Sequence, residues 1–452
     1  MFTNVAAFLI ASVAITGAPG TLVVPDVEQA VKETASVSAT TADVELAPPA
    51  AGRSRSDGTE TVATGRALLD TMAGMSAREI RQFVDASPAE VRSFLLDPPS
   101  ASTVTSWWRL ASTKDRSALV AGAPEIVGNL DGLPVSLRDG ANRVELETTI
   151  TETENALAGL GRAEQGEASQ RLHMLKEIRE ALVRASGEPR KQLLSVDTEW
   201  PGRAAVVLGD LSTADYVTYM VPGMFFTVDN QMVDWTVISN DLYDEQQRWV
   251  NQLGRTDPAL SDASVAVVSW IGYETPGLLD IASLDLAKVG AKFISSSVHG
   301  VQATRKTHEP HVTLVTHSYG STATLMALQD GAVEVDSLVI IGSPGGSAQS
   351  VEDIRMPADR VFVGEAAWDP VVNSAFFGSD PGSASFGATP MAVDGGHDPI
   401  TGELLSPALG HLGYFDAGTE AMRNMALVGL DRGDLVADTV DAPSRVLRAD
   451  RR

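Results

Sequence analysis

Short apolar runs rich in β-branched residues alternate with helical stretches through the C-terminal part of this chain. The runs begin near residue 196 and read "AAVVLGD", "YVTYMVPG", "ASVAVVSWIGY", "HVTLVTHSYG", "DSLVIIGSPG" and "DRVFVGEAAWDP", with helices expected between them over 241–253, 279–298 and 321–330. Strands that are apolar on both faces must be covered on both faces. The alternation therefore predicts an α/β domain over 195–431, with a mainly parallel sheet between two layers of helices.

A helical region over 64–194 is expected before this domain. Ser76 with Glu79, and again Ser87 with Glu90, have the spacing of a capping box, in which each side chain accepts a hydrogen bond from the other residue's backbone amide. Pro88 fits the first position of the second helix. Both helices are therefore expected to begin at a capped N-terminus.

The second half of the helical region is expected to form a helical hairpin. Apolar residues at spacings of three and four predict an amphipathic helix pair that is broken near "GEAS" at 166–169. These residues are Leu146, Ile150, Leu157, Leu160, Leu172, Leu175, Ile178 and Leu182.

The two ends of the chain have a different composition. Residues 1–23 form a signal-like apolar segment, although no Lys or Arg occurs before Lys32, so an internal start or a buried hydrophobic helix are alternatives. Residues 24–63 are rich in Ala, Thr, Ser, Val, Glu and Asp and are expected to be a low-complexity linker. Residues 432–452 are expected to be a polar tail.

The charge balance argues against several classes of partner. Acidic residues number 59 against 34 basic ones, for a net charge of −25, and such a surface repels nucleic acids and anionic headgroups. The chain contains no cysteine, which excludes disulfides and thiolate sites. Apart from the N-terminal segment, no stretch is long and apolar enough to predict a membrane span.

A serine lies where one apolar run meets a helical stretch. The sequence Thr316-His317-Ser318-Tyr319-Gly320 is close to G-x-S-x-G, the turn that raises a nucleophilic serine above the edge of a sheet. Thr316 stands where that pattern has glycine. A small polar residue at an ordinary turn is the alternative interpretation of Ser318.

An acidic partner is expected after a later strand. Asp369 follows "RVFVGEAAW" and precedes a proline, which places it just beyond an apolar run. Asp380 and Asp394 are competitors in looser Gly- and Ser-rich sequence. Asp369 is the preferred acid.

The base is expected last in the chain. His411 lies in the glycine-rich "LGHLGYFD" before a predicted helix, and His397 is its competitor. His317 is expected to bond locally, since adjacent residues at such a turn point in different directions. The order Ser318, Asp369, His411 is that of α/β-hydrolases and differs from those of the two large serine-protease classes.

Two backbone amides are needed to stabilise an oxyanion. Tyr319 follows the nucleophile, and Gly223 and Met224 lie in the loop after an earlier strand, so these three residues are the candidates. A simple turn at "PG" is the alternative for Gly223.

No cofactor or metal is expected. The seven histidines include no H-E-x-x-H or comparable cluster. "IGSPGGSAQS" lacks the lysine of a P-loop, and "GLGRAEQGE" has no preceding strand for a dinucleotide site.

Several of these stretches together resemble a known family. "WWRLASTKDRSALVAGAPEIVGNLDGLPVSLRDGANR", "VPGM", "HSYGS", "VGEAAWDPV" and "GHLGYFD" are similar to an actinobacterial α/β-hydrolase family catalogued as domain of unknown function 1023, over roughly 107–430. The resemblance implies an α/β-hydrolase fold after a helical region, and it supports Ser318, Asp369 and His411 as the triad. It also implies export or association with the cell envelope, with a cytoplasmic location as the alternative.

The sequence thus predicts a serine hydrolase of esterase or lipase type that acts on a small-molecule or lipid-like ester through an acyl-enzyme. An acyltransferase with the same triad is one alternative. A non-catalytic envelope protein on a hydrolase scaffold, with a protein partner docked on the helical region, is the other.

Overall fold

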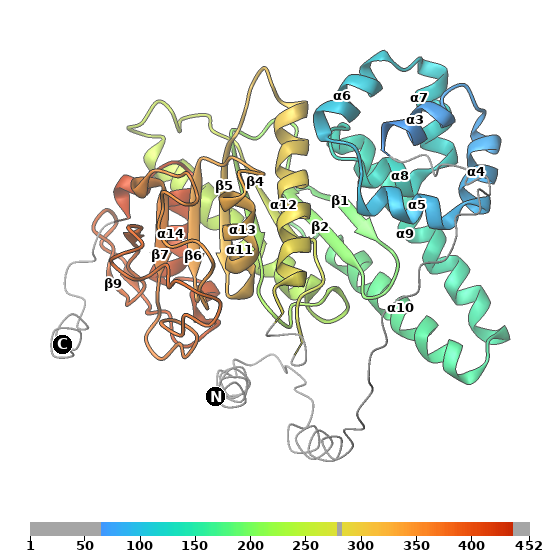
Figure 1. The fold of residues 1–452 in the computed structure, drawn as a ribbon. Helices are drawn as coiled ribbons and strands as arrows, with labels where there is room; N and C mark the ends of the chain where they lie inside the picture. Colours follow the sequence, from blue (N-terminus) through green and yellow to red (C-terminus); the bar gives the residue numbers. More distant parts are fainter. Residues whose placement is uncertain (1–64, 278–282, 437–452) are drawn as a thin grey trace, which may run out of the picture.

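One twisted sheet organises the larger part of the molecule (Figure 1). The computed structural model describes residues 65–277 and 283–436. In this part of the chain, eight strands follow the order β1-β2-β4-β3-β5-β6-β7-β8, and only β1 with β2 and β2 with β4 pair antiparallel. The predicted mainly parallel sheet is confirmed. The strands are β1 (Lys191–Asp197), β2 (Arg203–Gly209), β3 (Tyr216–Val221), β4 (Val265–Ile271), β5 (His311–His317), β6 (Ser337–Ile341), β7 (Val361–Gly364) and β8 (Thr389–Pro390).

Helices cover both faces of this sheet. Successive strand residues point to opposite faces, so Val206 and Leu208 join one apolar cluster while Ala205 and Val207 join another. Helices α11 (Val228–Leu253) and α14 (Glu420–Gly429) complete the first cluster, and α12 (Asp285–Thr304) and α13 (Tyr319–Gln329) complete the second. Short 3₁₀ turns follow at Ala358–Arg360, Gly413–Phe415 and Gly433–Leu435.

The sheet starts earlier than the sequence indicates. The expected boundary at 194/195 falls inside β1, whose sequence "KQLLSVD" has no β-branched run to mark it. Helix α11 begins at Val228, well before the expected start at residue 241, and ends at Leu253 as expected. The earlier start is explained by its first half, which packs Met232 and Trp235 into the core. Helix α12 begins and ends about six residues later than expected, at Asp285 and Thr304.

The helical region has an apolar core of its own, which includes Leu69, Ile80, Phe94, Trp107 and Leu119. It contains α3 (Arg66–Met72), α4 (Ala77–Ala86), α5 (Pro88–Leu96), α6 (Ala101–Leu110), α7 (Thr113–Gly122), α8 (Pro124–Asn129), α9 (Val135–Ala156) and α10 (Arg162–Ala181). In Figure 1 helices α3 to α8 lie beside β1, at one edge of the sheet.

One of the two predicted capping boxes is present. Ser76 and Glu79 bond reciprocally at the start of α4. The prediction of a capping box at Ser87 and Glu90 is wrong. Pro88 does occupy the first turn of α5, but Ser87 has φ −129° and ψ 48° and its side chain makes no capping hydrogen bond. Only one residue separates α4 from α5, so Ser87 must also end the preceding helix.

The helical hairpin is present, but its break is not where it was predicted. Helix α9 ends at Ala156, a 3₁₀ turn spans Leu157–Gly159, and α10 begins at Arg162, so "GEAS" lies within α10. Gly161 is the N-cap residue of α10, and its amide donates a hydrogen bond to the Glu164 carboxylate. Leu146, Ile150, Leu175 and Ile178 pack against the sheet, so this hairpin belongs to the core of the α/β domain.

The expected signal-like segment at 1–23 and linker at 24–63 lie outside the described residues, as does most of the tail at 432–452. Among the residues that the structure describes, no helix has the length and apolar character needed to cross a membrane.

Candidate active site

Ser318 lies at a sharp turn between β5 and α13. Its backbone has φ 53° and ψ −131°, a conformation that residues other than glycine rarely adopt. The turn is closely packed, since a Cβ on Gly320 would lie 2.4 Å from the Pro222 carbonyl oxygen. Thr316 fits where the pattern has glycine because its hydroxyl donates a hydrogen bond to the Val339 carbonyl at 3.0 Å. The region therefore has the strained strand–turn–helix geometry of a nucleophile elbow.

The structure brings Ser318, Asp369 and His411 together. His411 Nε2 lies 2.9 Å from Ser318 Oγ, and His411 Nδ1 lies 3.0 Å from each carboxylate oxygen of Asp369. All three side chains are buried. With Nδ1–H donating to the carboxylate, Nε2 is left to accept the proton of the serine hydroxyl. This hydrogen-bonded series can remove a proton from Ser318.

Asp369 is held as a carboxylate. Burial raises its pKa, but the hydrogen bond and charge of His411 and donation from the Val371 amide and the Tyr414 hydroxyl outweigh burial, so its pKa lies below the usual value. A carboxylate that stays ionised can orient the His411 ring and stabilise its protonated form.

The competing residues have other roles. Asp380 accepts a hydrogen bond from the amide of Gly382 in a turn, and His397 lies on strand β9 (Gly396–His397) with its Nδ1 3.2 Å from the Gly402 carbonyl oxygen. Neither residue has a hydrogen bond to Ser318, and the same is true of Asp394 within the described part of the chain.

The three oxyanion candidates also lie around Ser318. A Cβ built on Gly223 would lie 2.4 Å from Ser318 Cβ and 2.9 Å from its Oγ, so only glycine fits at this position. Met224 follows with its side chain in the core, and Tyr319 is the first residue of α13. Two backbone segments thus meet beside the hydroxyl.

Sequence reasoning missed Tyr414. Its hydroxyl donates to Asp369 Oδ2 at 2.8 Å and accepts the Ala366 amide at 2.8 Å, and the side chain is fully buried. Burial and the charge of Asp369 raise the pKa of Tyr414 well above its usual value, so the phenol keeps its proton. No motif spacing marks this residue, because its partner is 45 positions away.

His317 also supports the site, as a local donor. Its Nε2 donates to the His411 backbone carbonyl at 2.8 Å. Burial, together with the nearby His411, lowers the pKa of His317 to about 3, so the ring is neutral. The residue before the nucleophile thus ties the strand to the loop that carries His411.

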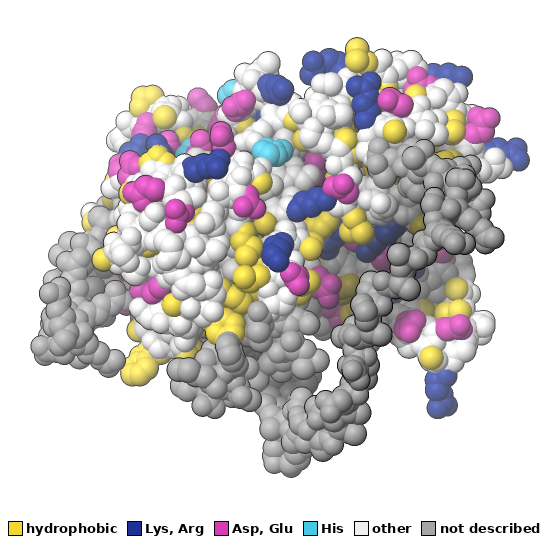
Figure 2. Space-filling view, viewed as in Figure 1, with side chains coloured by type: hydrophobic (Ala, Val, Ile, Leu, Met, Phe, Trp, Pro, Cys, Tyr) yellow, Lys and Arg dark blue, Asp and Glu magenta, His cyan; other side chains and the backbone are white. Residues whose placement is uncertain are grey.

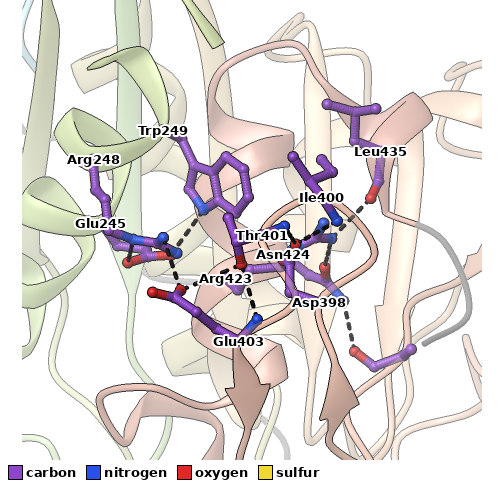
Figure 3. Close-up of polar contacts among 11 residues, drawn as sticks. Glu245, Arg248, Trp249, Asp398, Ile400, Thr401, Glu403, Arg423, Asn424 and Leu435 are labelled. Atoms are coloured by element: carbon purple, nitrogen blue, oxygen red, sulfur yellow. Dashed lines mark hydrogen bonds and ion pairs between the residues drawn. The ribbon is translucent and has the colours of Figure 1, made fainter. Parts of the chain in front are cut away.

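A polar network connects the segments that precede and follow the His411 loop (Figure 3). Arg423 on α14 donates through Nε to Asp398 at 2.7 Å, and both side chains are buried. Asp398 belongs to the hairpin of β9 (Gly396–His397) and β10 (Leu404–Leu405), and Arg248 on α11 reaches Glu403 of the same hairpin at 3.2 Å. Because the loop runs from this hairpin to α14, both of its ends are fixed.

The described residues contain no cluster of three or more His, Asp or Glu side chains that could hold a metal ion.

Comparisons with known proteins agree with this architecture. Residues 197–379 match the model of a family described as alpha/beta hydrolase. Over 403 residues the chain is 27% identical to the uncharacterized protein Rv2079 of Mycobacterium tuberculosis, a match that covers 78% of this chain and 59% of that protein. A second relative, the uncharacterized protein Mb0988c of Mycobacterium bovis, is 28% identical over 231 residues, covering 50% of this chain and 82% of its own.

Among solved structures, carboxyl esterase 2 of Tuber melanosporum aligns with a TM-score of 0.33 and 11% identity over 56% of this chain and 90% of its own. A thermostable esterase from Pseudomonas putida aligns with a TM-score of 0.30 and 10% identity, over 65% of this chain and 98% of its own. The strand order, the elbow and the matching family model together identify an α/β-hydrolase fold preceded by a helical region.

Proposed function

We propose that this protein is a serine hydrolase that cleaves carboxylic esters. The observation that carries the proposal is the unbroken series of contacts from Ser318 Oγ through His411 to the Asp369 carboxylate, at 2.9 and 3.0 Å. It is supported by the position of the serine at a closely packed turn after β5. The mycobacterial origin of the similar proteins fits the resemblance to an actinobacterial family.

The proposed reaction has two stages. Ser318 Oγ attacks the ester carbonyl while His411 Nε2 takes its proton, and the resulting oxyanion is stabilised by the backbone amides of Tyr319 and of Gly223 or Met224. The carbon–oxygen bond to the alcohol then breaks as His411 returns the proton to the leaving oxygen. Water attacks the acyl-enzyme in the same way and releases the acid. Asp369 stabilises the imidazolium throughout.

The test is covalent labelling combined with kinetics. A fluorophosphonate probe is expected to modify Ser318 at one site per chain, and Ser318→Ala is expected to lose labelling and about 10⁴-fold or more in kcat/KM toward a p-nitrophenyl ester. Ser385→Ala, which removes an exposed serine hydroxyl, is the matched control and should keep both. Undiminished hydrolysis by Ser318→Ala would refute the assignment. Absence of labelling in the folded wild type would favour the non-catalytic scaffold, and ester products formed from an added alcohol would favour acyl transfer.

A further inference from the structure

Four of the loops around Ser318 carry almost no charge. Residues 221–227, 342–350, 366–379 and 404–415 include no Asp, Glu, Lys or Arg other than Asp369, although 21% of the chain is charged. Asp369 is buried against His411 and does not contribute to the surface. These four loops therefore present few charged side chains beside the nucleophile in a chain whose net charge is −25, and the charged residues nearest to them at this edge, Glu274 after β4 and Glu365 after β7, are acidic.

Two large apolar side chains project from this surface. Trp368 is 88% exposed and Leu409 is 53% exposed. They lie close together, because Ala367 pairs with Leu409 in a parallel bridge and the Gly410 amide donates to the Ala367 carbonyl at 3.1 Å. Trp368 directly precedes Asp369, and Leu409 lies two residues before His411, so both flank the triad.

The backbone at Trp368 is in a conformation unusual for its residue type. Its φ is 64°, in the left-handed region that is unfavourable for a bulky side chain. An indole that is 88% exposed buries little apolar area on folding, whereas a Trp and a Leu side by side are suited to entering an apolar surface.

More aromatic side chains continue the surface toward the nucleophile. Phe376 and Phe377 are half-buried in the same loop as Trp368, and the Phe377 ring lies 5.3 Å from that of Tyr319, the residue after Ser318. Figure 2 shows hydrophobic side chains along the lower edge of the molecule, where β5, β6 and β7 end. The apolar surface thus extends from the exposed Trp368 to the neighbourhood of the nucleophile.

We propose that Trp368 and Leu409 insert into the surface of an aggregated, uncharged lipid ester, and that such lipids are the substrate class. The inference of a substrate rests on the proposed function, since it places the apolar surface beside the reactive serine. The charge of the chain selects among lipid surfaces: a protein with a net charge of −25 is repelled by anionic headgroups, and the four loops contain no Lys or Arg to offset that repulsion.

Binding can be tested apart from catalysis. The full chain carrying Ser318→Ala is mixed with droplets of neutral triacylglycerol coated with phosphatidylcholine, and bound protein is measured by flotation. We expect this protein to float with the droplets. Adding Trp368→Ser and Leu409→Ser should weaken binding about tenfold or more, because two large apolar side chains no longer leave water. Leu110→Ser is the matched control, since Leu110 is 81% exposed on α6 in the helical region, and it should float like the parent.

The outcomes separate the two proposals. If the Trp368→Ser/Leu409→Ser protein floats with the droplets as well as its Ser318→Ala parent, the docking inference is wrong, whatever the activity. If the Ser318→Ala parent binds phosphatidylglycerol vesicles as well as it binds the phosphatidylcholine-coated droplets, the selection for uncharged surfaces is wrong. If sedimentation shows a dimer that these two substitutions dissociate, the surface is covered by a second copy and the inference is wrong. Flotation that behaves as expected, together with inactivity toward every ester, would instead count against the hydrolase proposal.

Discussion

Removing the hydroxyl of Tyr414 tests whether the triad depends on a fourth residue. Tyr414→Phe deletes one hydrogen bond to the Asp369 carboxylate and leaves the Ala366 amide without its acceptor. Asp369 keeps its contacts with His411 and the Val371 amide, so its position is loosened rather than lost. The substitution therefore removes support for the acid without touching the nucleophile or the base.

The expected magnitudes follow from the partners that are lost. A hydrogen bond to a charged group contributes about 1.5–3 kcal/mol, and an unpaired buried amide costs about 1–3 kcal/mol, so we expect the free energy of unfolding to fall by about 2.5–6 kcal/mol. If about half of the bond to the carboxylate acts in the transition state, kcat falls by about tenfold, which corresponds to ~1.4 kcal/mol. KM should change little, because Tyr414 is fully buried and away from any substrate surface.

The pH dependence of stability gives a second measure. Asp369 has a lowered pKa in the folded protein, so its contribution to stability is present above its unfolded pKa and is lost as the pH falls through the folded pKa. The Tyr414 hydroxyl is one of the groups that lower this pKa. The difference in unfolding free energy between the wild type and Tyr414→Phe should therefore narrow on acidification.

The assay compares steady-state kinetics on a soluble ester with denaturant unfolding at several pH values. Tyr216→Phe is the matched control, since its hydroxyl has no hydrogen bond among the described residues, and it should keep kcat. An unchanged kcat in a destabilised Tyr414→Phe protein would show that Tyr414 is only structural, and the reasoning about Asp369 would be wrong.

Two other substitutions test the packing around the site. His317→Asn removes a buried ring whose pKa is lowered to about 3. A histidine with a lowered pKa in the folded protein makes the free energy of unfolding fall as the pH drops below the pKa of the same histidine in the unfolded chain. Between about pH 7 and pH 5 the wild type should therefore lose about 2 kcal/mol more unfolding free energy than His317→Asn, and equal losses in denaturant titrations would contradict this. Gly223→Ala would place a methyl group 2.4 Å from Ser318 Cβ, so kcat/KM should fall by about 100-fold, whereas Gly140→Ala, with nothing within 4 Å, should keep its activity. Full activity of Gly223→Ala would remove this loop from the site.

The sequence alone determined the class of the fold and the order of the reactive residues. Runs such as "VAVVSWI" and "HVTLVTH" place apolar residues at both odd and even positions, and a sheet covered on both faces is needed to bury them. Ser318, Asp369 and His411 each follow an apolar run or precede a predicted helix, and parallel strands bring such positions to one edge of the sheet. These features depend on local composition and periodicity, which can be read along the chain.

The tertiary structure decided what depends on contacts between distant segments. Strand β1 and the start of α11 have no strong local signal and are specified by packing against the sheet. Ser87 has the spacing of a capping box but must also end α4, so its side chain does not cap. Tyr414 meets Asp369 across 45 residues, and Trp368 and Leu409 become neighbours only through a bridge between two loops. Such proximity follows from how the elements pack, because hydrogen bonds and apolar contacts act through space and not along the sequence.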